Sequence, residues 1–153
     1  MINQFTICRI FLVRKVIIWT YGRSGVAESE LHRFLKRVAA EKLEKKGFSI
    51  YLEPEWPPID LLEWQRYRPD IFGIRRRDRL DEYAFVECET NPNSKRILAK
   101  NVSSIVIQTR LLKDTKSRKI LAIPRTKVAA LDPSVMKLWE VWAIEGPAWF
   151  QQT

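Results

Sequence analysis

An apolar strand that carries two carboxylates constrains this chain more than any other feature. Residues 83–89 combine aromatic and β-branched side chains, which favour strands, with Glu87 and Glu89. Because successive strand side chains point to opposite faces, the two glutamates share one face and Cys88 points to the other. Carboxylates gathered on one patch of a sheet repel each other and lose hydration, a cost that is usually tolerated only when a cation lies beside them.

A second strand precedes this one and is expected to form a hairpin with it. Pro69 can open a strand because it has no amide to donate, and residues 71–74 supply strand-forming bulk. The polar run at 75–82 has no apolar period and predicts the turn. Asp70 lies at the start of the first strand, so pairing places its carboxylate beside the two glutamates. Oxygen ligands of this kind suit Mg²⁺ or Mn²⁺, and the hairpin therefore predicts a metal site.

The Pro-Asp pair at 69–70, followed by Glu-x-Glu at 87–89, resembles the PD-(D/E)xK nuclease superfamily, which includes restriction endonucleases and archaeal Holliday-junction resolvases. The resemblance implies that Asp70 and Glu87 bind metal and act in catalysis, and that Glu89 also acts in catalysis, by ligating the metal or by orienting the attacking water. Glu89 occupies the position at which the superfamily usually has its catalytic lysine. Some restriction enzymes of the superfamily carry glutamate there, and other branches use a lysine from the next helix.

That next helix is expected at residues 92–113, with apolar positions at spacings of four, three, four and three from Leu98 onward. Extending this stripe back by three residues places Lys95 in the first turn, on the inward face, near the end of the carboxylate strand. Lys100 is two residues beyond Leu98 and points elsewhere. We therefore expect Lys95 to be the basic residue nearest the carboxylates, as a salt-bridge partner, as the catalytic lysine, or as both.

The clearest helix is expected at residues 27–46, where apolar side chains recur at intervals of three and four and Gly47 follows as the stop. Glu28 lies on the flank of the apolar stripe, and the superfamily often has a glutamate in its first helix that completes the metal site. The resemblance implies that Glu28 binds the metal through water; the alternative is an acidic residue that only stabilises the helix N-terminus. His32 is the only histidine, and we expect a partly buried side chain rather than a catalytic base.

The remaining elements complete an α/β (α+β) fold with a mixed central sheet flanked by helices. Strands are expected at 48–52 and 119–123, and a short helix starts at 132–133 with aspartate as the cap and proline after it. A last strand at 138–144 carries apolar side chains on both faces, so we expect it to be covered on both. The order helix, strand, strand, strand, helix, strand over residues 27–124 resembles the common core of restriction endonucleases.

Length and charge bound the domain count and the class of partner. The 153 residues, 46% of them hydrophobic, are expected to form one nuclease-like domain with an N-terminal extension (1–24), the common core (27–124) and a C-terminal helix and strand (125–153). Lys and Arg number 27 against 18 Asp and Glu, and the net charge of +9 favours a polyanionic partner. A solvated basic surface is the alternative, but an acidic metal site in a basic protein suits phosphodiester cleavage.

Several arginines near the predicted hairpin are candidates for contacts with a nucleic-acid backbone. The candidates are Arg66, Arg68, Arg75, Arg76, Arg77 and Arg96. The first two end a long segment, 53–68, that contains three prolines and several aromatic residues. A loop of this length is commonly functional, and its aromatic side chains either cap the core or stack on bases.

The N-terminal segment is apolar at residues 5–19, but Arg9, Arg14 and Lys15 interrupt it. We expect neither a spanning helix nor a signal peptide, and therefore no membrane partner. Its β-branched and aromatic side chains favour one or two edge strands; a basic surface-bound helix and a true start farther downstream are the alternatives. Two cysteines cannot form a disulfide framework or a four-ligand zinc site, so we expect a cytoplasmic protein.

Together these features predict a Mg²⁺- or Mn²⁺-dependent endonuclease or exonuclease that hydrolyses DNA phosphodiester bonds. DNA is the expected partner, RNA is an alternative, and assembly as a homodimer is compatible with the sequence. The second hypothesis is a nucleic-acid-binding protein that has the nuclease fold without catalysis, because the Glu-x-Lys motif is missing. A third is a structural component of a ribonucleoprotein.

Overall fold

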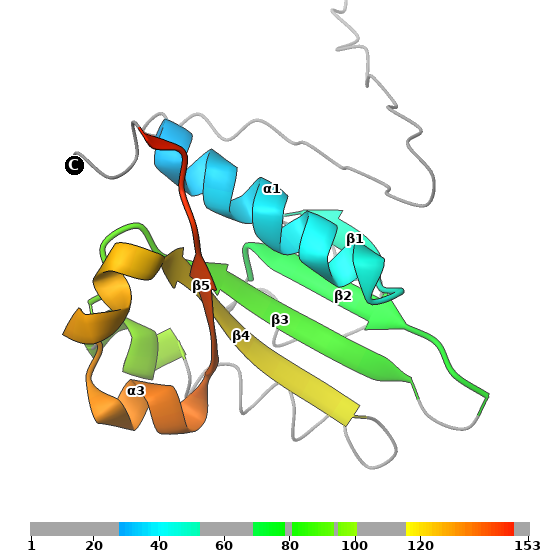
Figure 1. Cartoon of the computed structure of the whole chain (residues 1–153). Helices are drawn as coiled ribbons and strands as arrows, with labels where there is room; N and C mark the ends of the chain where they lie inside the picture. The colour runs from blue at the N-terminus through cyan, green and yellow to red at the C-terminus, as the bar shows by residue number, and fades with distance from the viewer. Residues whose placement is uncertain (1–27, 53–68, 79–80, 94, 101–115, 149–153) are drawn as a thin grey trace, which may run out of the picture.

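A mixed five-stranded sheet forms the centre of the fold (Figure 1). The computed structural model describes residues 28–52, 69–78, 81–93, 95–100 and 116–148. Its strands are β1 (Ser49–Leu52), β2 (Ile71–Arg75), β3 (Glu82–Cys88), β4 (Lys116–Pro124) and β5 (Glu140–Ile144). They lie in that order across the sheet, antiparallel from β1 to β3 and parallel from β3 to β5. The prediction of an α+β fold with a mixed sheet is therefore confirmed.

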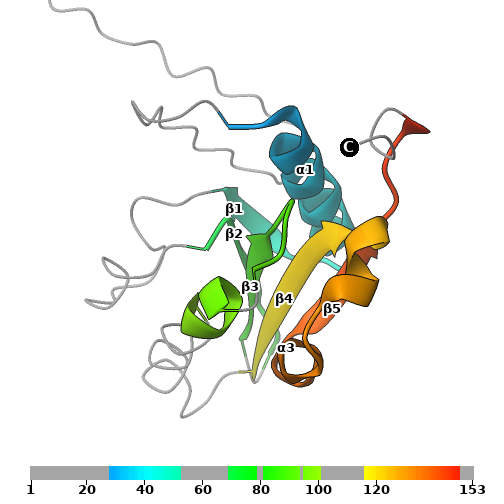
Figure 2. The same ribbon diagram turned by 90° about the vertical axis from the view of Figure 1, so that its left-hand side faces the viewer.

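Helices lie on both faces of the sheet. Figure 2 shows α1 (Glu30–Lys45) on one side and α3 (Pro133–Leu138), with the helical residues 95–100, on the other. A short 3-10 helix, η2 (Arg125–Ala130), leads from β4 toward α3. Among the helices that the structure describes, none combines the length and the apolar character needed to cross a membrane.

Local capping sets the two ends of α1. Ser29 is the N-cap, and its hydroxyl oxygen accepts a hydrogen bond from the His32 amide at 3.2 Å. Gly47 follows the helix with a φ of 86°, a left-handed conformation that costs glycine little. The helix therefore begins at Glu30 rather than at residue 27, and Glu28 lies in the segment that leads into it.

The predicted hairpin is confirmed by the pairing of β2 with β3. The two strands are antiparallel, with Ile71 opposite Val86 and Arg75 opposite Glu82. Arg75 Nε donates a hydrogen bond to Glu82 at 3.1 Å. The first and last residues of the expected polar turn therefore belong to the strands, where their opposite charges pair across the ladder.

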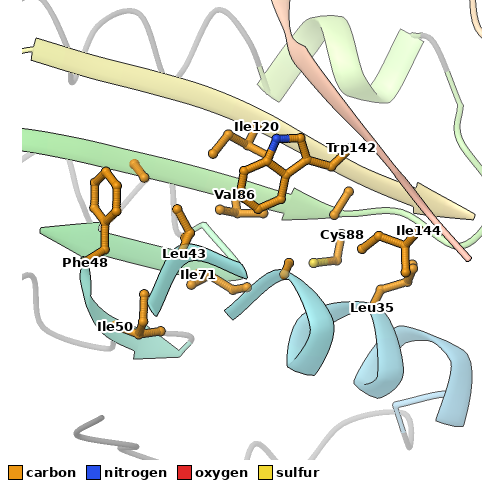
Figure 3. Packing of buried hydrophobic residues seen from close by; sticks show 13 residues of the cluster. Leu35, Leu43, Phe48, Ile50, Ile71, Val86, Cys88, Ile120, Trp142 and Ile144 are labelled. Atoms are coloured by element: carbon orange, nitrogen blue, oxygen red, sulfur yellow. The ribbon is translucent and has the colours of Figure 1, made fainter. Parts of the chain in front are cut away.

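Among the described residues, apolar clusters pack against both faces of the sheet. The larger lies between α1 and the sheet, and Figure 3 shows its side chains pointing toward one another from both layers. Its buried members include Leu35, Leu43, Phe48, Ile50, Ile71, Val86, Cys88, Ile120, Trp142 and Ile144. The second cluster lies on the opposite face and consists of Ile97, Leu121, Ile123, Leu131, Val135 and Trp139.

The prediction that the last strand is covered on most of both faces is confirmed only in part. Trp142 and Ile144 of β5 are buried, whereas Glu140 and Ala143 are exposed. Two apolar residues assigned to that strand lie elsewhere, because Leu138 ends α3 and the next residue is its C-cap. Within β5, Trp142 and Ile144 pack in the larger cluster, while on the other face only Val141 packs, partly buried, against the second cluster.

We expect Leu35→Ala to lower the free energy of unfolding by about 2–5 kcal/mol, because Leu35 is fully buried in the larger cluster. Met136→Ala is the matched control, since Met136 on α3 is 51% exposed and its truncation is expected to change stability by no more than about 0.5 kcal/mol. Urea unfolding followed by circular dichroism measures both variants. Equal losses for the two would contradict the packing of α1 on the sheet.

Candidate functional site

The carboxyl end of the central strand carries the candidate site. Every residue of β3 is buried, and Glu87 is only 1% exposed. Cys88 packs in the cluster beneath α1, whereas Glu87 and Glu89 both contact Lys100, which lies in helical residues 95–100. The predicted division of these three side chains between the two faces of the sheet is therefore confirmed.

One ammonium group joins the two glutamates. Lys100 Nζ donates hydrogen bonds to Glu87 Oε2 and to Glu89 Oε1, the latter at 3.1 Å. Burial lowers the pKa of Lys100, but the negative charges around it, that of Glu87 first, together outweigh burial and hold its pKa above the ordinary value. Arg96 is 66% exposed and approaches Glu89 Oε1 only to 3.7 Å. Lys100 is thus a cation that compensates both buried carboxylates.

The expected position of Lys95 is wrong. Lys95 is exposed, and Lys100 takes the place beside the carboxylates. The inward face of this helix passes through Ile97, which is buried, and Lys100 lies three residues beyond it on the same face. The prediction used Leu98 as the anchor, but Leu98 is only partly buried. Adjacent residues of a helix differ in direction by about 100°. Taking Leu98 instead of Ile97 as the inward position therefore puts Lys95, instead of Lys100, on the inward face.

Asp70 precedes β2 and lies next to the end of β3. Its Oδ2 atom accepts a hydrogen bond from the Cys88 amide at 2.7 Å and lies 3.4 Å from His32 Nε2. Burial raises the pKa of Asp70, but the hydrogen bonds from His32 and Cys88, with the nearby positive charges, outweigh burial and hold the pKa below its ordinary value. Asp70 therefore stays ionised at neutral pH, next to the backbone at the end of β3.

A second group of charges, the α1 ionic cluster (Glu28, His32 and Lys36), lies on the other side of Asp70. Glu28 Oε1 is 3.1 Å from His32 Nδ1 and 2.5 Å from Lys36 Nζ. His32 thus bridges two carboxylates, and its hydrogen bond to Asp70 raises its pKa despite partial burial. Lys36 is buried, which the sequence analysis did not predict. Glu28, His32 and Lys36 are spaced four residues apart, and this spacing is the sequence signal for side chains that pair along one face of a helix.

The described parts of the chain contain no group of three or more Asp, Glu, His or Cys side chains arranged to hold a metal ion. Lys100 lies between Glu87 and Glu89, and Glu28 pairs with side chains of α1. The donor chemistry itself suits Mg²⁺ or Mn²⁺, because Asp70 and Glu87 offer carboxylate oxygens at the ends of neighbouring strands.

The arginines expected to contact nucleic acid differ in their surroundings. Arg75 is engaged within the fold, since its guanidinium pairs with Glu82 and donates to the Lys46 carbonyl oxygen at 2.6 Å. The same group lies over the ring of Phe48. Arg76, Arg77 and Arg96 are exposed, whereas Arg66 and Arg68 lie outside the described residues. Three of the six candidates are therefore seen to be open to a polyanion.

Comparisons with known proteins identify no relative of this chain. No family model matches the sequence, and neither a curated protein nor a solved structure gives a match. The chemistry of the site consists of carboxylates buried at a strand end, one ammonium group shared between two of them, and a histidine bridge to the third.

The only histidine makes the electrostatics of the site measurable. We expect the imidazole of His32 to titrate with a pKa above 6.5, and Asp70→Asn to lower that pKa, because the bond to a charged group is lost while burial remains. Since the folded pKa is raised, its contribution to stability is complete below a pH of about 6.5 and is lost as the pH rises through the folded pKa.

An NMR titration of the imidazole C–H signals measures this pKa in each variant. Asp78→Asn is the control, since Asp78 is exposed and the variant carries the same change of charge. A wild-type pKa at or below 6.5, or an equal decrease in the two variants, would contradict the bridge between His32 and Asp70.

Proposed function

We propose that this protein is a metal-dependent nuclease of the restriction-endonuclease type that hydrolyses DNA phosphodiester bonds. The observation that carries the proposal is the gathering of charged side chains at one end of the central strand, namely Asp70, Glu87, Glu89 and Lys100. Burial of carboxylates is costly, and replacing a buried ion pair with apolar residues is often neutral or stabilising. A purely structural role therefore explains these buried charges poorly, whereas binding of Mg²⁺ or Mn²⁺ would explain why carboxylates are placed there.

The order of the elements also supports the proposal. From α1 to β4 the described residues form one helix, three antiparallel strands, the helical residues 95–100 and a parallel strand. This is the order that the resemblance to the PD-(D/E)xK superfamily implies. Lys100 adds support, because some branches of that superfamily take their catalytic lysine from the helix after the carboxylate strand.

The side chains suit distinct roles in phosphodiester hydrolysis. Asp70 and Glu87 would hold the ion, which when bound lowers the pKa of the attacking water. Lys100 would neutralise the negative charge that develops on the phosphate in the transition state. Glu89 keeps that ammonium group at the site through its 3.1 Å hydrogen bond. Lys100 therefore replaces Lys95 as the proposed catalytic lysine.

The charge of the protein supports a nucleic acid as the partner. The net charge is +9, and Arg76, Arg77 and Arg96 are exposed on the hairpin and on the helical residues beside the site. Arginine and lysine side chains bind phosphate backbones by releasing counterions, so affinity falls steeply as salt is added.

A nucleic-acid-binding protein without catalysis is the second candidate. The contact of Lys100 with both Glu87 and Glu89 favours it, because an ammonium group already compensates these carboxylates without a metal. On this account the cluster only holds helical residues 95–100 against the sheet. A preference for RNA over DNA in a binding competition would point instead to a ribonucleoprotein component.

We expect Glu87→Gln to abolish Mg²⁺-dependent cleavage of plasmid DNA while DNA binding stays equal or becomes slightly stronger. The variant removes a proposed metal ligand and also a negative charge that repels phosphates. A nicking assay with Mg²⁺ against EDTA, and a binding titration at several salt concentrations, measure the two effects. Glu41→Gln is the control, because Glu41 is exposed on α1 and the change in net charge is the same.

The outcomes separate the candidates. If the wild type cuts and Glu87→Gln only binds, the nuclease proposal stands. If both bind and neither cuts with Mg²⁺ or Mn²⁺, the binding protein without catalysis replaces it. If neither binds nucleic acid at low salt, the basic charge is a solvated surface and both candidates are rejected.

Lys100→Gln is expected to reduce the cleavage rate by about 10²–10³-fold, the usual cost of removing a group that stabilises transition-state charge. Lys95→Gln is the matched control, since Lys95 is exposed in the same helical segment, and its cleavage rate should stay close to that of the wild type. Single-turnover cleavage at saturating protein measures the rates without a contribution from binding. Equal rates for the two variants would contradict the role of Lys100.

A further inference from the structure

Among the described residues, His32 links the α1 ionic cluster to the proposed metal site. Its Nδ1 atom lies 3.1 Å from Glu28 Oε1, and its Nε2 atom lies 3.4 Å from Asp70 Oδ2. The ring comes from the first turns of α1, whose N-terminus is fixed by the Ser29 cap. The two ring nitrogens therefore hold a carboxylate that precedes the helix and a carboxylate that precedes β2.

Asp70 is held through a single oxygen. Within the described residues, its hydrogen bonds from the Cys88 amide and from His32 both go to Oδ2. The amide is part of the backbone at the end of β3, so its position is set by the sheet. With Oδ2 held in this way from two directions, the carboxylate plane is fixed, and neither of these two hydrogen bonds involves Oδ1, the oxygen that we assign to the ligand.

Glu28 lies within ion-pair distance of two side chains of α1. The same Oε1 atom that contacts His32 also contacts Lys36 Nζ at 2.5 Å, and the Lys36 side chain is only 10% exposed. A buried ammonium group and an imidazole together draw this carboxylate toward α1. Glu28 is therefore placed to act on Asp70 through His32 rather than to bind an ion directly.

We propose that His32 is a positioning residue that orients Asp70 for the divalent cation, and that Glu28 and Lys36 hold His32 in place without Glu28 being a ligand. The inference rests on the proposed function. It changes the role that the resemblance implies for Glu28, from a ligand through water to a partner of the histidine. Groups that orient a metal ligand in this way typically contribute about 10–100-fold to metal affinity.

Two substitutions at His32 separate its two contacts. The amide nitrogen of Gln can reach the position of Nε2, so His32→Gln keeps a donor toward Asp70. The shorter Asn places its amide near Nδ1, so His32→Asn keeps the donor toward Glu28 and loses the one toward Asp70. Both variants are polar and remove the same ring, and the site is partly exposed, which makes them a matched pair.

Mn²⁺ binding to the full chain, measured by calorimetry in the absence of DNA, tests the proposal. We expect His32→Asn to weaken Mn²⁺ binding by about 10–100-fold, and His32→Gln, which keeps the donor toward Asp70 but loses the contact with Glu28, to weaken it less. Glu28→Gln should weaken binding in the wild-type background and have no further effect in the His32→Asn background. Thermal unfolding without Mn²⁺ reports any common loss of stability.

Three results would overturn the proposal, and they are distinguishable. Equal Mn²⁺ affinities for His32→Asn and wild type would show that His32 does not position a ligand, and the proposed nuclease would still stand. An equal loss from Glu28→Gln in both backgrounds would make Glu28 a direct ligand. A wild-type protein that binds no Mn²⁺ would remove the proposed metal-dependent function together with this inference.

Discussion

The burial of a charged residue in the central strand is the constraint on which the rest of the structure depends. Glu87 is 1% exposed, and leaving a carboxylate unpaired at that depth would cost several kcal/mol. The compensating charge comes from Lys100, and the position of Lys100 depends on the packing of Ile97 against the second face of the sheet. The apolar packing and the charged site are thus two parts of one arrangement.

Asp70 connects the two faces of the sheet at the end of β3. It contacts His32 on the α1 side, and the positive charge of Lys100 on the other side helps to keep it ionised. The strand end therefore gathers charges from α1, from the hairpin and from helical residues 95–100. Under the proposed function, the carboxylates of this group would bind a cation and the Lys100 ammonium group would contact a phosphate.

The sequence predicted those features of the site that follow from backbone periodicity. The faces taken by Glu87, Cys88 and Glu89 follow from strand alternation, which tertiary packing does not alter. The position of Lys100 was not predictable in this way, because Ile97 and Leu98 are both apolar and only packing against the sheet decides which one is the anchor. Lys36 was missed because a lysine in a helix is usually solvated, and its burial depends on Glu28, which lies outside the helix.

The most direct test of the central claim is a crystal structure of the full chain soaked with Mn²⁺, with anomalous diffraction used to locate the ion. The account predicts an anomalous peak within coordinating distance of Asp70 and Glu87, with the Lys100 ammonium group displaced from between the two glutamates. A structure at saturating Mn²⁺ in which Lys100 still bridges Glu87 and Glu89, with no anomalous peak beside Asp70, would contradict it.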